Sequence, residues 1–386
     1  MIAAVCAALI SAGCVKRYSD SPPLAFADVP YVGPTGTVWP LKSVQLEGAK
    51  ARYNLGHAPT LRYVELNETG TTTVVFLHGL GSYLKFWRSQ LDETAAKGYR
   101  VIAIDQLGFG KSEKPATFPY TTESFAENVV EVLDLLHIDK AILVGHSMGG
   151  QTALSTAIRY PDRVSALALV SPAGFEVFST REQKWFKNVY SRALVIGQDE
   201  EGIWGNIREL NFQKWVPDHE WLVEERVRES KPVAEGLEDA EKAAAAARSK
   251  PGADLAAIDA EEKAAKALAV AQAKEFDSYA YAQVRTVEGL TQNNFVRESL
   301  NKVQAPTVII YGSGDRLIPN MFLHGGFTKT VMAVGQAGIP GSQLVELEGC
   351  GHTLQLDCTA EFNKTLFEFL AKVSTASTTT TAAAAH

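Results

Sequence analysis

Three residues of this chain, a serine, an aspartate and a histidine, have the types and settings that nucleophilic catalysis requires. Ser147, Asp315 and His352 each follow an apolar run typical of a buried strand. A serine hydroxyl becomes a good nucleophile when a neutral imidazole removes its proton, and a carboxylate fixes the tautomer of that imidazole. The sequence therefore predicts Ser147 as the nucleophile, His352 as its general base and Asp315 as the acid that orients the base.

The residues around Ser147 indicate a sharp turn between a strand and a helix. Gly145 and Gly149 flank the serine, and residues 151–160 have the pattern of a helix. Such a turn strains the serine backbone and brings neighbouring chain close, which a Cβ at either glycine would obstruct. Because the first N–H groups of a helix favour negative charge, we expect the Met148 N–H to be one donor of an oxyanion hole. The alternative is a glycine-rich turn with an inert serine.

A second donor is expected from the loop that follows the apolar run 73–77. That loop reads His78-Gly79-Leu80-Gly81, and its glycines let the backbone approach a substrate. We predict that the Leu80 N–H completes the oxyanion hole. By itself the motif also fits an ordinary glycine loop at a strand end. Asp105 ends the next predicted strand, but it precedes the serine, so we expect it to brace loops and not to be the catalytic acid.

The elements that must position these residues follow an alternating order. Strand and helix patterns alternate through residue 170, which predicts a mostly parallel sheet covered by helices. Two early strands, 44–48 and 61–66, are expected to be joined by a polar turn. The predicted core has two parts, residues 44–174 and residues 303–373.

Residues 175–302 separate the two parts of the core and have a helical pattern that is rich in aromatic residues at its start. An insertion at this place predicts a helical cap over the site. Within it, residues 233–276 contain 17 alanines among 44 positions and are broken at Lys250-Pro251-Gly252, which predicts an antiparallel helical hairpin. The hairpin is either a docking arm for an unknown protein partner, a lid extension, or a structural protrusion in solvent.

Composition excludes several classes of protein. The 386 residues are 46% hydrophobic and 21% charged, as in a globular chain, and the net charge is −7. No basic block suggests a nucleic-acid partner. No His/Cys spacing resembles a zinc site and no phosphate-binding glycine motif opens a helix, so we expect neither a metal nor a nucleotide cofactor.

The two ends of the chain differ from its middle. Residues 1–13 carry no charge and fit a signal segment, and they end in Ser11-Ala12-Gly13-Cys14, which resembles the lipobox of bacterial lipoproteins. That resemblance implies a lipid on Cys14 and anchoring in the cell envelope, although Ser11 stands where Leu is usual and no basic residue precedes the apolar run. The alternative is a cleaved signal peptide and a periplasmic or secreted protein. Residues 14–43 are proline-rich and predict a tether or a surface strap, and residues 374–386 predict a disordered tail.

Cys350 and Cys358 remain as an even pair eight positions apart. They either form a disulfide that clamps the loop carrying His352 or stay as two buried thiols.

Taken together, five motifs resemble the signature set of the α/β-hydrolase family over residues 44–174 and 303–373. They are His78-Gly-Leu-Gly81, Asp105-x-x-Gly-x-Gly-x-Ser112, Gly145-His-Ser-Met-Gly149, Gly314-Asp315 and Gly351-His352. The resemblance implies the same roles for Ser147, Asp315 and His352, and an oxyanion hole from Leu80 and Met148. Because a serine and not an aspartate occupies the sharp turn, dehalogenase and epoxide hydrolase chemistry are disfavoured. The alanine-rich hairpin lies outside the family pattern.

These residues predict a serine hydrolase that cleaves a carboxylic ester of a small or medium apolar substrate through an acyl intermediate on Ser147. C–C bond or amide hydrolysis by the same three residues is the first alternative. An alternative of another class is an envelope lipoprotein that docks a partner through the hairpin and keeps a vestigial triad.

Overall fold

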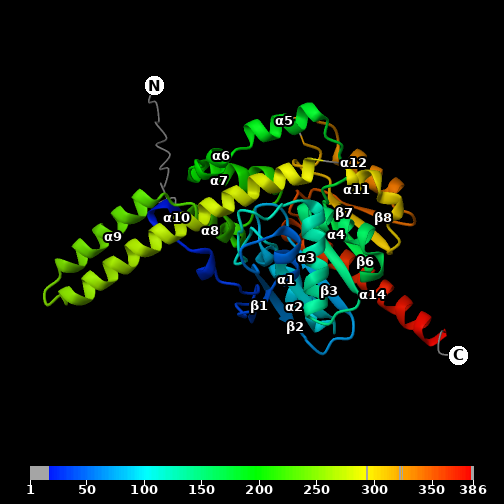
Figure 1. Ribbon diagram of the computed structural model, residues 1–386, viewed down its shortest axis with the longest axis horizontal. Coiled ribbons are helices and arrows are strands. Elements are labelled where there is room, and N and C mark those ends of the chain that lie inside the picture. Colours follow the sequence, from blue (N-terminus) through cyan, green and yellow to red (C-terminus); the bar gives the residue numbers. More distant parts are fainter. Residues whose placement is uncertain (1–16, 293, 321–322, 324, 384–386) are drawn as a thin grey trace, which may run out of the picture.

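The computed structural model describes residues 17–292, 294–320, 323 and 325–383. Its centre is an eight-stranded sheet with the strand order β1-β2-β4-β3-β5-β6-β7-β8 (Figure 1). The strands are β1 Leu41–Gln45, β2 Thr60–Leu66, β3 Thr73–Leu77, β4 Arg100–Asp105, β5 Ala141–His146, β6 Val164–Val170, β7 Thr307–Gly312 and β8 Gln343–Leu347. β2 runs antiparallel to both β1 and β4, and all other neighbours are parallel. The predicted α/β fold with a mostly parallel sheet is confirmed.

The central strands are apolar along their whole length because both faces of the sheet are covered. β3, β5 and β7 are buried at every position. Alternate side chains of β3 enter two separate cores: Val75 and Leu77 pack on one face, and Val74 and Phe76 on the other. The continuous apolar runs in the sequence are therefore strands buried on both sides.

Helices supply the second half of each core. The first face is covered by α1 Glu47–Tyr53, α3 Thr122–Leu135, α4 Met148–Arg159 and α12 Thr328–Gly338, and the opposite face by α2 Arg88–Ala96 and α14 Thr359–Ala383. This two-sided cover fixes the carboxyl ends of the parallel strands, from which the candidate catalytic residues extend.

Two local predictions were wrong. The segment after β1 forms α1 where a strand to residue 48 and a polar turn were expected, because Ala49 packs into the core and the Gly48 N–H donates to Glu131 Oε1 at 2.6 Å. The expected disorder from residue 374 is replaced by the end of α14, which runs to Ala383. Once the start of α14 is anchored in the core, each further residue of this alanine- and threonine-rich stretch needs only one more helical hydrogen bond.

The described part of the predicted tether, residues 17–43, is a strap packed on the body of the molecule. Tyr18, Phe26, Tyr31 and Trp39 are buried. The Trp39 indole Nε1–H donates to Asp92 Oδ1 at 2.7 Å. The predicted signal segment and Cys14 lie outside the described residues.

A series of helices is inserted between β6 and β7. It comprises α5 Thr180–Val189, α6 Arg192–Ile196, α7 Glu200–Trp204, a π-helical turn Gly205–Glu209, α8 Glu220–Glu229, α9 Val233–Arg248, α10 Leu255–Thr291 and α11 Phe295–Glu298. α9 and the first half of α10 form an antiparallel pair that projects from the body (Figure 1). α10 extends beyond the expected residue 276, because Tyr279 and Ala280 are buried in the main core, where Tyr279 packs against Phe109. No helix among residues 17–383, as far as these are described, is both long and apolar enough to span a membrane.

Candidate active site

Ser147 stands at the junction of β5 and α4 with a positive φ of 52° and a ψ of −115°. Two glycines make this junction sterically feasible. A Cβ on Gly145 would lie 2.3 Å from the Gly149 carbonyl oxygen, and a Cβ on Gly149 would lie 2.2 Å from that of Leu77. The sequence thus places a strained serine where two strands and the start of a helix meet, as expected for an exposed nucleophile.

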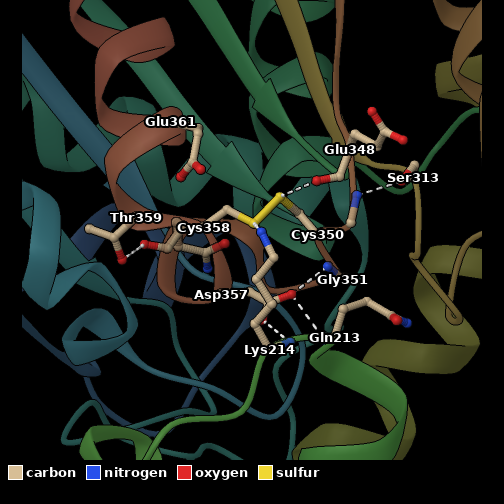
Figure 2. The surroundings of a disulfide bond; sticks show 12 residues. Gln213, Lys214, Ser313, Glu348, Cys350, Gly351, Asp357, Cys358, Thr359 and Glu361 are labelled. Atoms are coloured by element: carbon tan, nitrogen blue, oxygen red, sulfur yellow. Dashed lines mark hydrogen bonds between the residues drawn. A yellow bond between two sulfur atoms is a disulfide. The ribbon is translucent and has the colours of Figure 1, made fainter.

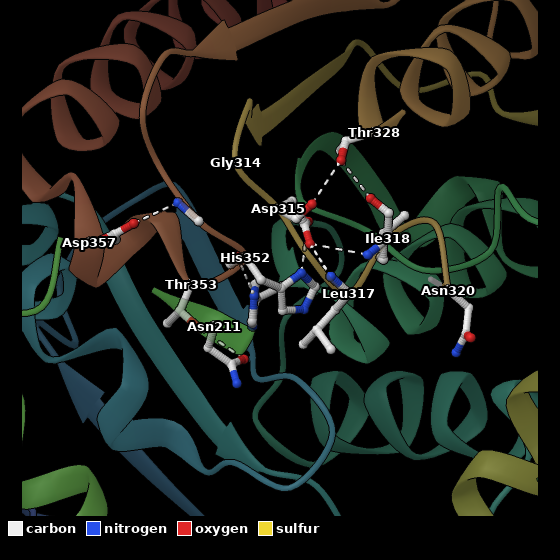
Figure 3. Close-up of polar contacts among 12 residues, drawn as sticks. Asn211, Gly314, Asp315, Leu317, Ile318, Asn320, Thr328, His352, Thr353 and Asp357 are labelled. Carbon is white, nitrogen blue, oxygen red and sulfur yellow. Dashed lines mark hydrogen bonds and ion pairs between the residues drawn. The ribbon is translucent and has the colours of Figure 1, made fainter. Parts of the chain in front are cut away.

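Asp315 and His352 come from the loops after β7 and β8 and form a buried pair (Figure 3). His352 Nδ1 lies 2.8 Å from Asp315 Oδ2. Because the carboxylate only accepts, the proton of the imidazole sits on Nδ1 and Nε2 remains an acceptor. Asp315 Oδ1 accepts the backbone N–H groups of Leu317 at 2.8 Å and Ile318 at 3.1 Å, which fixes the carboxylate in place.

The structure brings the candidate residues to one cavity of about 650 Å³ beneath the cap. Ser147 and His352 line it, together with Leu80 and Met148, and Asp315 supports His352 from behind. Aromatic side chains from the cap form much of its wall: Phe178, Trp185, Phe186, Tyr190, Phe276 and Tyr279. The cavity therefore suits an apolar ligand with a reactive group near Ser147.

The two predicted oxyanion donors have backbone settings that fit this role. Met148 is the first residue of α4, where the helix offers its N–H no acceptor. Leu80 lies in a tight turn whose next carbonyl, that of Gly81, accepts from Arg226 Nη2 at 2.7 Å and from the Tyr279 hydroxyl at 3.2 Å. Two cap residues thus hold the peptide between Gly81 and Ser82, one residue beyond Leu80. Sequence reasoning missed this role of Arg226, and no local pattern marks it.

His78 fixes the other end of the same turn. Its Nε2 accepts the Gln106 N–H at 3.0 Å, so its Nδ1 carries the proton and donates to the Gly79 carbonyl at 2.8 Å. Burial lowers the pKa of His78 to about 4. The imidazole therefore stays neutral and keeps both hydrogen bonds at physiological pH.

His146, which precedes Ser147, supports the loop of His352. Its Nε2–H donates to the His352 carbonyl at 3.0 Å, and the two rings lie 4.8 Å apart. Burial lowers the pKa of His146 well below its usual value, and the nearby His352 acts in the same direction. His146 is thus a neutral support beside the candidate base.

Asp105 joins three segments, as the sequence predicted. It accepts the Tyr31 hydroxyl at 2.5 Å and the N–H groups of Leu84 and Lys111, both at 2.8 Å. Burial raises the pKa of Asp105 to about 6 even though these hydrogen bonds favour the carboxylate. Its partners are structural, and it has no contact with His352.

A disulfide between Cys350 and Cys358 encloses the loop that carries His352 (Figure 2). Inside this loop Asp357 accepts three backbone N–H groups, from Gly351 at 2.5 Å, Gln213 at 2.9 Å and Lys214 at 2.6 Å. Asp357 was not identified from the sequence, where only its position beside Cys358 marks it. It ties the loop to itself and to the cap.

The cap segment around residue 213 also contacts the loop of Asp315. The Gln213 side-chain amide donates to the Gly314 carbonyl at 2.9 Å, and Arg316 donates to the Glu209 carbonyl at 2.7 Å. The Thr353 N–H donates to the Asn211 carbonyl at 3.0 Å. The cap thus helps to position both partners of the Asp315–His352 pair. Within the part of the chain that is described, no three His, Cys, Asp or Glu residues are grouped so as to hold a metal ion.

The chain is similar in sequence and in fold to known hydrolases. A 2-hydroxy-6-oxononadienedioate/2-hydroxy-6-oxononatrienedioate hydrolase of Paraburkholderia phymatum is 28% identical over 335 residues, which cover 84% of this chain and 96% of the relative. A probable hydrolytic enzyme from Pseudomonas aeruginosa PAO1 has the same fold, with a TM-score of 0.67 and 22% identity over 88% of this chain and 98% of that chain. An esterase from Exiguobacterium antarcticum is similar with a TM-score of 0.57 and 21% identity, over 81% of this chain and 96% of that chain.

The family profile of the alpha/beta hydrolase fold matches residues 72–358, which include all three candidate catalytic residues and the cap. The chain is therefore a member of the alpha/beta hydrolase family.

Proposed function

We propose that this hydrolase cleaves a carboxylic ester of a small or medium apolar substrate through an acyl intermediate on Ser147. The observation that carries the proposal is the Asp315–His352 pair, joined at 2.8 Å, whose histidine lines the same cavity as Ser147. The walls of the cavity are mostly apolar and aromatic, which supports an uncharged ester as substrate.

In the proposed reaction His352 Nε2 takes the proton of the Ser147 hydroxyl as its oxygen attacks the ester carbonyl. The negative charge on the former carbonyl oxygen is stabilised by the N–H groups of Leu80 and Met148. The imidazolium then protonates the leaving alcohol, and Asp315 stabilises it in the meantime. A water molecule, deprotonated by His352, attacks the acyl-serine. The bond to Ser147 Oγ then breaks, the imidazolium returns its proton to that oxygen, and the acid is released.

C–C bond hydrolysis is the second candidate, because the relative from Paraburkholderia phymatum is named for a dienedioate substrate and not for an ester. The same nucleophile and oxyanion hole would serve. The chemistry differs at the leaving group, which departs as a carbon and needs a proton there, whereas an alkoxide leaving group needs only the proton that His352 carries. We favour the ester because its leaving alcohol can take the proton that His352 would carry, so no further proton donor is needed.

Fluorophosphonate labelling followed by peptide mass analysis tests whether Ser147 is nucleophilic. We expect labelling of Ser147 in the wild type and none in Ser147→Ala. Ser155→Ala is the matched control, since Ser155 is buried on α4 and is not part of the cavity wall. A folded wild-type protein that takes no label would overturn the proposal and favour the docking alternative.

A substrate panel then separates the reactions. The ester proposal predicts the highest kcat/KM for p-nitrophenyl butyrate, compared with a 2-hydroxy-6-oxo-dienoate and a proline anilide. A higher kcat/KM for the dienoate would transfer the assignment to C–C hydrolysis, and one for the anilide to amide hydrolysis.

A further inference from the structure

α5 is an amphipathic helix without a core beneath it. Its start is well defined, because Ser179 and Glu182 form a reciprocal capping box. Trp185, Phe186 and Val189 lie on one side of the helix, yet no residue of α5 is buried. An amphipathic helix of a globular protein normally places its apolar side on a core. In Figure 1, α5 lies at the outer edge of the molecule, above α10.

The apolar side of α5 is part of a larger exposed patch. We call it the apolar rim, and it consists of Val177, Trp185, Val189, Leu194 and Ile196, whose exposed fractions range from 37% to 53%. Three of them, Trp185, Val189 and Leu194, also line the cavity that contains Ser147. The exposed apolar surface is therefore continuous with the wall of the active site.

The polar side of α5 is basic. Arg181, Lys184 and Lys187 are exposed and spaced three residues apart, which places them along one stripe of the helix. None of these three forms an ion pair with the described residues of the chain, although the whole protein carries a net charge of −7. A helix with a basic polar side and Trp and aliphatic residues on the other is typical of segments that lie in a membrane interface.

We infer that α5 and the apolar rim bind the surface of an anionic lipid assembly, from which an ester enters the cavity. A protein partner is a poorer occupant, because a protein seated on the rim would cover the approach to Ser147 along Trp185, Val189 and Leu194. A lipid surface covers the same residues and supplies the substrate. The entry of an ester rests on the proposed function, whereas binding to the lipid surface does not.

Vesicle sedimentation tests the binding. The full chain with Cys14→Ser is used, which removes any lipid that this residue carries, and the same change is present in every variant. We expect binding to phosphatidylglycerol vesicles, weakened by salt, and weaker binding to phosphatidylcholine. Lys184→Glu/Lys187→Glu should lower the partition coefficient at least about tenfold, since each basic residue near an anionic surface contributes several-fold. Neither lysine lines the cavity, so hydrolysis of a soluble ester should stay unchanged.

Lys140→Glu is the matched control, because Lys140 is exposed and precedes β5, at the opposite end of that strand from Ser147. It should bind vesicles like the parent chain. Equal binding by the parent and by Lys184→Glu/Lys187→Glu, or no binding by either, overturns the inference. If the protein bound vesicles but hydrolysed no ester, the inference of lipid binding would stand and only the proposed function would be overturned.

Discussion

The two carboxylate oxygens of Asp315 have different partners, and this difference makes the tautomer of His352 testable. Oδ1 accepts two backbone N–H groups, whereas Oδ2 faces His352 Nδ1. In Asp315→Asn the remaining carbonyl oxygen must therefore stay on the backbone, and the amide NH₂ must face His352. The imidazole proton then moves to Nε2, and a protonated Nε2 cannot accept the proton of Ser147. We expect kcat to fall on the order of 10³–10⁴-fold with little change in melting temperature.

Steady-state kinetics and thermal unfolding of the purified variant check this prediction. A loss of activity smaller than tenfold would remove Asp315 from the orienting role. Asp357→Asn is the useful comparison. Asp357 accepts only backbone N–H groups. We therefore expect Asp357→Asn to act mainly on the melting temperature, and Asp315→Asn mainly on kcat.

Glu229 is a second carboxylate whose setting makes a prediction, this time about stability. It is fully buried on α8, and neither of its carboxylate oxygens accepts a hydrogen bond from the described residues. Burial raises the pKa of Glu229 to about 8, even though the guanidinium of Arg226 lies 3.6 Å away and favours the carboxylate. The ordinary pKa of a glutamate is about 4.5. Between these two values the folded chain holds a proton that the unfolded chain has released.

The free energy of unfolding should therefore fall as the pH rises from about 4.5 to about 8. Glu229→Gln keeps the neutral shape and removes this loss, so its stability relative to the wild type should increase over that range by a few kcal/mol at most. Urea unfolding at pH 5, 7 and 9 measures the difference. Glu261→Gln, at an exposed position of α10, should show a difference that does not vary with pH. If the difference in unfolding free energy between Glu229→Gln and the wild type stayed the same at all three pH values, Glu229 would not be buried in its protonated form.

The candidate catalytic residues share one feature: each is marked by a sequence pattern within a few positions of it. Ser147 is marked by its two glycines, and Asp315 and His352 by the strands before them. Arg226 and Glu229 have no such signal. The partner of Arg226 is the Gly81 carbonyl, 145 positions away, and the environment of Glu229 exists only after the cap has packed on the core. Sequence patterns report local backbone needs and do not report contacts of this range.

At the scale of elements, the loop from Cys350 to Cys358 connects stability with catalysis. The disulfide encloses His352, and Asp357 fastens the same loop to the cap. Cys350→Ala/Cys358→Ala should lower the free energy of unfolding by about 2–3 kcal/mol, the effect of opening a short loop in the unfolded chain. We expect kcat to fall more than KM changes, since the cavity walls are untouched while His352 gains freedom.

Denaturant unfolding with and without reductant provides the control for this prediction. Reductant should lower the stability of the wild type to that of the double variant and leave the variant unchanged. An equal response of both proteins would mean that the bridge does not form in solution.

The sequence predicted most helices and strands correctly by type, but it did not predict where several of them end. The buried strands were visible as apolar runs, because both faces of the sheet are covered. α1 was missed, since its only buried residue is Ala49 and a short polar stretch gives no helical period. α10 and α14 exceed their expected ends because packing or helix propagation, and not a stop signal in the sequence, decides where they finish.

At the scale of the whole molecule, the cap and the hairpin differ in how they are tied to the core. The cap segment at residues 209–214 and Arg226 contact the loops of Asp315, His352 and Leu80. The distal hairpin is held by contacts between its own two arms: Ala244 and Ile258 are buried, and exposed ion pairs join Arg248 to Asp259 and Lys266 to Glu241. We therefore expect catalysis to depend on the cap body and not on the tip of the hairpin.

Deleting residues 243–264 and joining Lys242 to Ala265 by a four-residue Gly-Ser loop tests this division. The ion pair of Lys266 with Glu241 lies just inside the cut and keeps the two arms in register. Because the removed residues contact neither the cavity nor the core strands, kcat/KM for a soluble ester should stay within about twofold of the wild type. Gly236→Leu is the contrasting variant at the base of the hairpin. A Cβ there already lies 2.8 Å from the Ala269 Cβ and 3.0 Å from Pro23, so the larger side chain should force the arms and the strap apart and lower the melting temperature. A shortened chain that folds but loses ester hydrolysis would show that the tip acts on the active site, as a lid extension would.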